Sequence, residues 1–175
     1  MRGAVLLSLF GLVAGAVPAA AGPVAAGPVA VAFDHPETYT DATLYGGHGL
    51  KAEQPALDAI AQYLERLGAR YLAPDQTLSI EVLNVDLAGQ YEPWRALSYD
   101  VRILRDIYPP RITLRYRLSE AGRTLVEGRE VVSDINYLAN GVARQDQDPL
   151  RYEKAMLSNW FQARLVARKA APGGA

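Results

Sequence analysis

Four aspartates are the side chains best suited to acid–base chemistry. Each lies at an end of a segment that we predict as a strand, and they are Asp86, Asp100, Asp106 and Asp134. Strand ends can converge on one rim of a sheet, where two carboxylates could act as general acid and general base of a hydrolase or transferase. Aspartate is also common there because its side chain caps turns. Capping is the simpler explanation, so paired aspartates are our alternative hypothesis and we assign no catalytic residue.

Other common catalytic and metal-binding patterns have little support. His35 and His48 are the only histidines. Asp34 and Asp41 lie near them in sequence, but the spacing matches no known set of metal ligands. The chain has no cysteine and no Gly-x-Ser-x-Gly nucleophile motif, and it has no calcium loop, phosphate loop or dinucleotide fingerprint. We expect no metal and no cofactor, and we leave open whether the chain is an enzyme.

A group of arginines could bind a ligand. All of them lie within residues 111–134, at odd-numbered positions: Arg111, Arg115, Arg117 and Arg129. Because side chains alternate between the faces of a strand, these arginines are predicted to share one face. Guanidinium groups pair well with phosphate and carboxylate. The simpler alternative is a solvated face whose charge is balanced by Glu127 and Glu130.

Two loop segments could add aromatic contacts. Trp94 and Arg95 lie in residues 87–99, which show no strand or helix periodicity, and both residue types are favoured anchors at interfaces. Tyr108 precedes two prolines, which together present a stiff apolar surface. The alternatives are that Trp94 closes the end of the core and that the prolines form a rigid corner.

A β-hairpin over residues 111–134 is predicted to position the arginines. Its first arm alternates polar residues with the apolar residues Ile112, Leu114, Tyr116 and Leu118, which gives one apolar and one basic face. Gly122 can supply the positive φ of a three-residue turn with a bulge. Two registers preserve the faces, one that pairs Glu127 with Arg115 and one that pairs it with Arg117.

The remaining pattern predicts two helices and further strands. One helix begins near Pro55 and runs to Tyr71, and a second begins at Asp148 and Pro149. Strands are predicted at 29–33 and 77–86, with a short one at 100–105. The order β-α-β-(β)-β-β-α predicts an α+β two-layer sandwich, in which a mostly antiparallel sheet of four to five strands carries two helices on one face. The other face of the sheet, with the arginines, is predicted to be open.

The N-terminus has the order of a secretory signal. A charged Arg2 precedes an apolar run and then small residues that end at Ala21, with Ala26 as a second possible cleavage point. An uncleaved membrane anchor is the alternative, but prolines interrupt the run. We expect residues 1–21 to be a signal peptide, 22–28 a flexible lead-in, 29–169 a single domain and 170–175 a disordered tail.

Composition agrees with an exported globular protein. The 175 residues carry a formal net charge of −1, so no overall field favours nucleic acid. Without cysteine the fold cannot rely on disulfides, a natural state for a soluble periplasmic protein. We expect no transmembrane span after cleavage of the signal.

Several short motifs resemble an uncharacterised exported bacterial family, domain of unknown function 3016, over residues 33–161. The motifs are Asp34-x-Pro36 with Tyr39-Thr40-Asp41, Val85-Asp86-Leu87-Ala88-Gly89, Asp100-Val101-Arg102, Asp106-x-Tyr108-Pro109-Pro110-Arg111, Ser133-Asp134-x-Asn136-Tyr137, Tyr152-Glu153-Lys154, Met156-Leu157 and Trp160-Phe161. The resemblance implies export and brings no established activity.

Two hypotheses follow from the sequence. The first is a non-catalytic binding or scaffold domain of the cell envelope, with an envelope protein or an anionic glycan or lipid head group as partner. The second is a small hydrolase or transferase that uses paired aspartates. A pocket with two neighbouring carboxyl groups would favour the second, and an exposed basic surface would favour the first.

Overall fold

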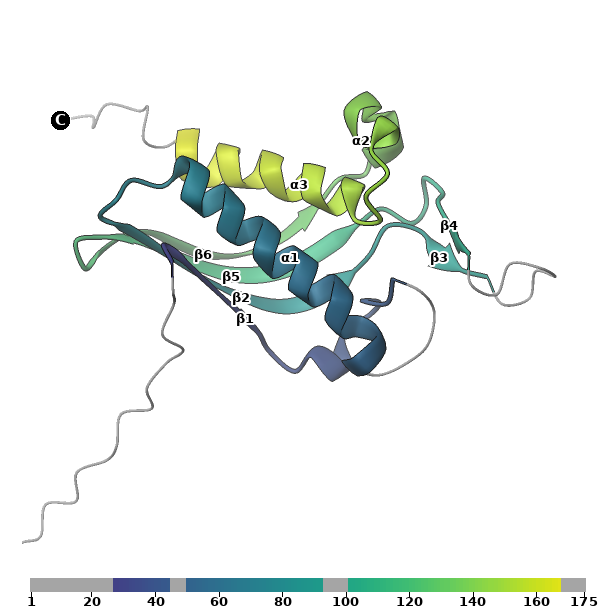
Figure 1. Cartoon of the computed structure of the whole chain (residues 1–175), viewed down its shortest axis with the longest axis horizontal. Coiled ribbons are helices and arrows are strands. Elements are labelled where there is room, and N and C mark those ends of the chain that lie inside the picture. The colour runs from purple at the N-terminus through teal and green to yellow at the C-terminus, as the bar shows by residue number, and fades with distance from the viewer. Residues whose placement is uncertain (1–26, 45–49, 93–100, 168–175) are drawn as a thin grey trace, which may run out of the picture.

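The computed structural model describes residues 27–44, 50–92 and 101–167. A four-stranded sheet has the order β1-β2-β5-β6, with β1 parallel to β2 and the other neighbours antiparallel. The strands are β1 (Val29–Phe33), β2 (Gln76–Asp86), β5 (Arg111–Glu120) and β6 (Arg123–Ser133). The helices α1 (Leu50–Tyr71) and α3 (Arg151–Phe161) lie side by side over one face of this sheet (Figure 1). The predicted α+β two-layer architecture is therefore confirmed.

The period-two alternation of β5 places its apolar side chains in the core. Ile112, Leu114, Tyr116 and Leu118 are buried, whereas Arg111, Arg115 and Arg117 are exposed. On β6, Glu127 pairs with Arg117, so the second of the two predicted registers is the correct one. β2 meets the other edge of β5 with its own buried side chains Leu78, Ile80 and Val82.

The hairpin turn is shorter than predicted. Strand pairing continues to Glu120 and Arg123, so the loop has two residues, Ala121 and Gly122, with φ values of 48° and 80°. Positive φ at both positions is the property of a type I′ turn, whose twist matches that of the flanking strands. The bulge lies outside the loop, within β6, where Leu125 is the extra residue between Thr124 and Val126.

The two long helices cover the sheet through apolar stripes. α1 (Leu50–Tyr71) buries Leu57, Ile60, Leu64 and Leu67, and α3 (Arg151–Phe161) buries Met156, Leu157, Trp160 and Phe161. α1 begins earlier than predicted, so Pro55 lies inside it. α3 begins later, because Asp148 accepts a hydrogen bond from the Leu150 N–H (2.8 Å) just before the first helical turn. A π-helical turn (Gln162–Val166) extends α3.

Shorter elements complete the chain. In the described part of the predicted strand at 100–105, residues 101–105, only β4 (Arg102–Ile103) is a strand. It pairs with β3 (Gln90–Tyr91) in a separate two-stranded sheet. The segment 135–147 contains a 3-10 turn (Tyr137–Ala139) and the short helix α2 (Gly141–Gln145), and another 3-10 turn (Pro36–Thr38) follows β1.

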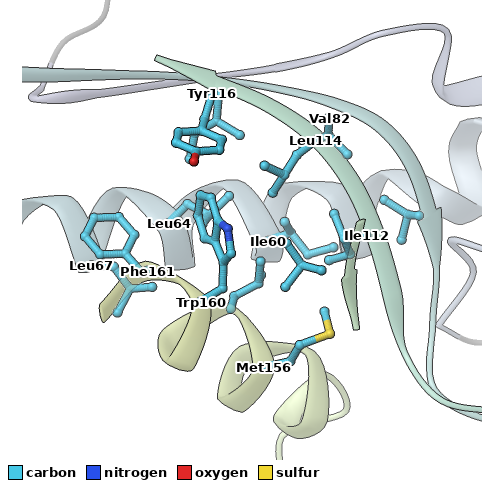
Figure 2. Packing of buried hydrophobic residues seen from close by; sticks show 14 of the residues in the cluster. Ile60, Leu64, Leu67, Val82, Ile112, Leu114, Tyr116, Met156, Trp160 and Phe161 are labelled. Carbon is cyan, nitrogen blue, oxygen red and sulfur yellow. The ribbon is translucent and has the colours of Figure 1, made fainter. Parts of the chain in front are cut away.

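Aromatic side chains join the two layers. Figure 2 shows Trp160 pointing from α3 toward Tyr116 on the sheet, with Leu64 of α1 beside it. The two rings meet edge to face, with centroids 5.3 Å apart. Over the described ranges, no helix is both long and apolar enough to cross a membrane.

Candidate functional site

The face of the sheet opposite the helices carries a hollow. The pairing registers place its side chains in two rows across the strands: Ala32, Glu81, Arg115 and Arg129 in one, and Ala30, Ser79, Arg117 and Glu127 in the next. These residues line a depression of about 720 Å³. β1 and β2 contribute the small side chains of Ala30, Ala32 and Ser79 to its lining, and longer arginine and glutamate side chains contribute the rest.

Charge on this face is only partly balanced. Arg115 forms an ion pair with Glu81, and Arg117 Nε donates to Glu127 Oε2 at 2.8 Å. Arg129 stands opposite Arg115 on the neighbouring strand and has no ion pair among the described residues. Three guanidinium groups therefore face two carboxylates. Exposed ion pairs contribute only about 0–1 kcal/mol each, so a ligand can exchange with them at little cost.

Glu130 does not contribute to this balance, contrary to the sequence-based alternative. It lies on the helix-facing side of β6 and accepts hydrogen bonds from Tyr116 Oη (3.0 Å), Trp160 Nε1 (3.2 Å) and Arg164 Nε (3.0 Å). Its carboxylate is committed to the contact between sheet and helix. The carboxylates of the open face are therefore Glu81 and Glu127 rather than Glu127 and Glu130.

Of the other predicted binding residues, Arg111 and Tyr108 do not line the hollow. Arg111 is exposed at the start of β5, where it lies opposite Asp86 in the pairing of β5 with β2. Tyr108 is half-buried and its carbonyl accepts the Gly89 N–H at 3.0 Å. The two prolines after it are buried, which fits a rigid corner. Trp94 and Arg95 lie outside the described residues.

The candidate acids that the structure describes have different surroundings. Asp134 accepts the Asn136 N–H at 2.9 Å, which is turn capping, and Asp106 is exposed. Asp100 lies outside the described residues. Asp86 is half-buried at the end of β2. Burial raises its pKa, and the charge of Asp41, which a parallel β-bridge holds beside it, adds to this rise.

Asp41 belongs to a network centred on Arg102, which the sequence did not reveal. Arg102 Nη2 lies 2.9 Å from both oxygens of the Asp41 carboxylate and donates to the Thr43 carbonyl at 2.7 Å. Its Nη1 donates to the Gly89 carbonyl at 3.0 Å, and the guanidinium lies 4.7 Å from the ring centroid of Tyr91. This one side chain, on β4, joins the segment after β1 to the turn between β2 and β3 and to Tyr91 of β3.

The described part of the chain holds no group of three or more metal-ligating side chains. His35 is exposed, and its Nδ1 lies 3.1 Å from Glu37 Oε1. That hydrogen bond raises the pKa of His35, with a further contribution from the charge of Asp34. His48 lies outside the described residues.

A family model described as "Protein of unknown function (DUF3016)" matches residues 27–163. The chain belongs to the DUF3016 family. Comparisons with curated proteins and with solved structures found no match.

The DUF3016 match runs from the residues before β1 to those just after α3, so it contains the whole main sheet, the hollow and the Arg102 network. It confirms the resemblance stated from the short motifs. Because the family description names no activity, the functional argument for this DUF3016 member rests on the geometry of its surface.

Proposed function

We propose that this DUF3016 protein is an exported, non-catalytic binding protein of the cell envelope, and that the hollow holds an acidic segment of another envelope protein. The observation that carries the proposal is Arg129, a guanidinium on the rim of the hollow with no ion pair in the described chain. Arginine binds carboxylate through two parallel hydrogen bonds, so a partner's Asp or Glu is the natural counterion.

The shape of the hollow supports a polypeptide partner. Ala30, Ala32 and Ser79 form a floor of small side chains over the width of two strands. A partner's apolar atoms can approach this floor closely while its acidic groups reach the arginine wall. Because a face with this many charges is well solvated in the free protein, the proposed complex is reversible rather than permanent.

A photo-crosslinking experiment tests the proposal. A benzophenone amino acid is placed at Ser79, inside the hollow, and in a matched protein at Gln62, which is exposed on α1 on the other side of the molecule. We expect the Ser79 protein alone to crosslink to a defined segment of one envelope protein. A synthetic peptide of that segment should bind less tightly by about tenfold or more when Arg129→Glu is introduced, and less tightly at high salt.

Three outcomes would overturn this assignment. The first is equal crosslinking from Ser79 and Gln62. The second is a crosslinked species that consists of glycan or lipid. The third is a peptide whose affinity is the same for Arg129→Glu and for Arg144→Glu, a charge reversal on the exposed helix α2.

Export rests on the order of residues at the N-terminus, with Arg2, an apolar run and Ala19-Ala20-Ala21. Expression of the full chain in a bacterial host should give a periplasmic protein whose first residue, by intact mass, is Gly22 or Gly27. Recovery of the uncleaved chain from the cytoplasm would contradict this part of the proposal.

Acid–base catalysis at Asp86 is the second candidate. A half-buried carboxyl with a raised pKa beside another carboxyl retains its proton to higher pH than an ordinary aspartate, as a general acid must. If Asp86 is catalytic, p-nitrophenyl esters, phosphates or glycosides should be hydrolysed and Asp86→Asn should lower kcat at least about a hundredfold, whereas Asp106→Asn should not. Absence of turnover on the whole panel rejects this candidate.

A further inference from the structure

The outer edge of β6 is unpaired in the described part of the chain. β6 is the last strand of the main sheet (Figure 1), and β5 is its one strand neighbour there. A free edge of this kind is a template for pairing with another strand. The 11 residues of β6 include no proline, which would remove a backbone donor. The strand at the opposite edge, β1, has five residues and none of them is charged, so β6 offers the longer and more specific edge.

The helices leave the edge of β6 partly uncovered. On the helix side of β6, Val126, Gly128 and Glu130 are half-buried, whereas the side chains on the same face of β5 are buried. Leu125 and Val131 of β6 are exposed apolar side chains. A further strand can therefore approach β6 from its outer side and cover apolar surface there.

The charge of Arg129 is uncompensated on the inner side of β6. Arg129 stands opposite Arg115 of β5, and like charges directly opposite each other destabilise a pair of strands. Arg115 is itself paired with Glu81 of β2, so this row across the sheet carries, from β2 outward, one negative and two positive side chains. The next place in the row lies outside β6. A carboxylate at that place would compensate Arg129.

A second copy of β6 provides this carboxylate when the two strands pair antiparallel. A two-fold axis through Gly128 places Glu127 of each copy opposite Arg129 of the other. It also places Leu125 of each copy opposite Val131 of the other, so the exposed apolar side chains meet across the axis. Opposite charges and apolar pairs on neighbouring strands both stabilise their pairing.

Charge disfavours the other axis positions near the middle of β6. An axis through a charged residue places two copies of that residue opposite each other, which excludes positions 127, 129 and 130. An axis through Val126 places Arg129 opposite Arg123 of the other copy. Between Val126 and Glu130, an axis through Gly128 is thus the one that brings no like charges together.

We propose that two copies of this chain join through β6 about a two-fold axis at Gly128, so that their four-stranded sheets form one continuous sheet. The bulge at Leu125 limits regular pairing to residues 126–130 of each copy. The dimer is therefore small and reversible rather than obligate. Across the axis, the row that ends at Arg129 in one hollow continues into Glu127 of the other, so the two hollows adjoin on the same side of the dimer.

The dimer does not depend on the acidic partner of the hollow. Each copy still brings three guanidinium groups and two carboxylates to the open face, so the joined surface keeps its net positive charge. The pair between Glu127 and Arg129 is exposed, and a partner's carboxylate can exchange with it at little cost. Self-association of the purified protein is measured without any partner, so its outcome is separate from that of the crosslinking experiment.

Sedimentation equilibrium of the purified protein tests the dimer. We expect a monomer–dimer equilibrium that Glu127→Arg and Arg129→Glu each weaken by about tenfold or more, because each places like charges opposite twice per dimer. An equimolar mixture of the two variants, or both substitutions in one chain, restores opposite charges. Both should associate within about threefold of the parent, and Glu65→Arg, at an exposed position on α1, should associate like the parent.

The register is tested by cysteine pairing, since the chain contains no cysteine of its own. Under mild oxidation a mixture of Glu127→Cys and Arg129→Cys should form a disulfide-linked dimer, because directly opposed residues of antiparallel strands lie within disulfide range. Neither variant alone should do so. A protein that stays monomeric up to about 1 mM, association that is insensitive to both charge reversals, or a disulfide in either variant alone would overturn the proposal.

Discussion

At the scale of single residues, the side chains that organise this protein act over long separations in sequence. Arg102 reaches Asp41, 61 residues earlier, and Glu153 reaches Ala88, 65 residues earlier. Neither contact leaves a local pattern. Glu153 nevertheless occupies the same helical stripe as the buried Met156 and Leu157, at spacings of three and four. A charged residue on an apolar stripe is the one signal that could have identified it.

The pKa of Glu153 also predicts how the stability of the fold depends on pH. Burial raises its pKa above the ordinary value of 4.5, and the Ala88 N–H and nearby arginines oppose that rise. The unfolded chain ionises this group near 4.5, whereas the folded protein retains the proton to higher pH. Stability from this group is therefore present at low pH and is lost as pH rises from about 4.5 through the folded pKa.

Glu153→Gln should remove that loss. In urea unfolding of the ligand-free protein, the variant should gain stability relative to the parent as pH increases from 4.5 to 8. A difference of one pKa unit corresponds to about 1.4 kcal/mol, which this measurement resolves. A constant difference across the whole range would contradict the account, and Glu65→Gln controls for the loss of one negative charge.

At the scale of elements, period-two alternation determined β5, its buried face and its register to within two choices, because the faces of a strand are a local property. The turn and the helix boundaries were predicted less well. Whether Ala121 adopts a positive φ depends on the twist of both arms, which no single residue type reports. Pro55 suggested the start of α1, yet the helix begins at Leu50 and contains the proline.

The hairpin turn yields a prediction of its own. Ala121 has a φ of 48°, a left-handed conformation that costs an L residue with a Cβ about 1–2 kcal/mol. Asparagine tolerates this conformation, and Asn-Gly is the preferred type I′ pair. Ala121→Asn should therefore raise the free energy of unfolding by about 0.5–1 kcal/mol, measured by urea titration.

A substitution at the next residue, Gly122→Ala, is the matched control, because it should destabilise the same turn. An added Cβ at Gly122 would meet no atom within 4 Å, so any loss in Gly122→Ala comes from the backbone conformation alone. We expect that loss to be about 1 kcal/mol. A stabilising Gly122→Ala, or an Ala121→Asn that is neutral or destabilising, would show that the turn has another conformation.

At the scale of the whole molecule, the two faces of the main sheet have different roles. The helices bury one face of the sheet, and that face holds the aromatic contact between Tyr116 and Trp160. The opposite face is expected to contribute little to stability, since its ion pairs are exposed. Sequence pattern could predict this division, because it needs only the alternation of β5 and the stripes of two helices. It could not predict the hollow, which depends on β1 placing Ala30 and Ala32 beside β2.

Glu130 tests this division of roles. It accepts hydrogen bonds from Tyr116 on the sheet and from Trp160 and Arg164 on the helical side, so one carboxylate joins the layers. Hydrogen bonds to charged groups contribute about 1.5–3 kcal/mol when protected from water, and this carboxylate is only partly exposed. Glu130→Ala should lower the free energy of unfolding by about 2 kcal/mol.

Glu127→Ala is the comparison within the same strand. Glu127 differs in facing the open side, where it pairs with the exposed Arg117, and such a pair contributes about 0–1 kcal/mol. Its removal should cost little stability but should change the affinity of the hollow for the proposed acidic partner. Glu130→Ala should lower stability and leave that affinity unchanged at temperatures where the variant remains folded. Equal destabilisation by the two variants would mean that the open face also supports the fold, and its arginines would then be structural rather than available to a partner.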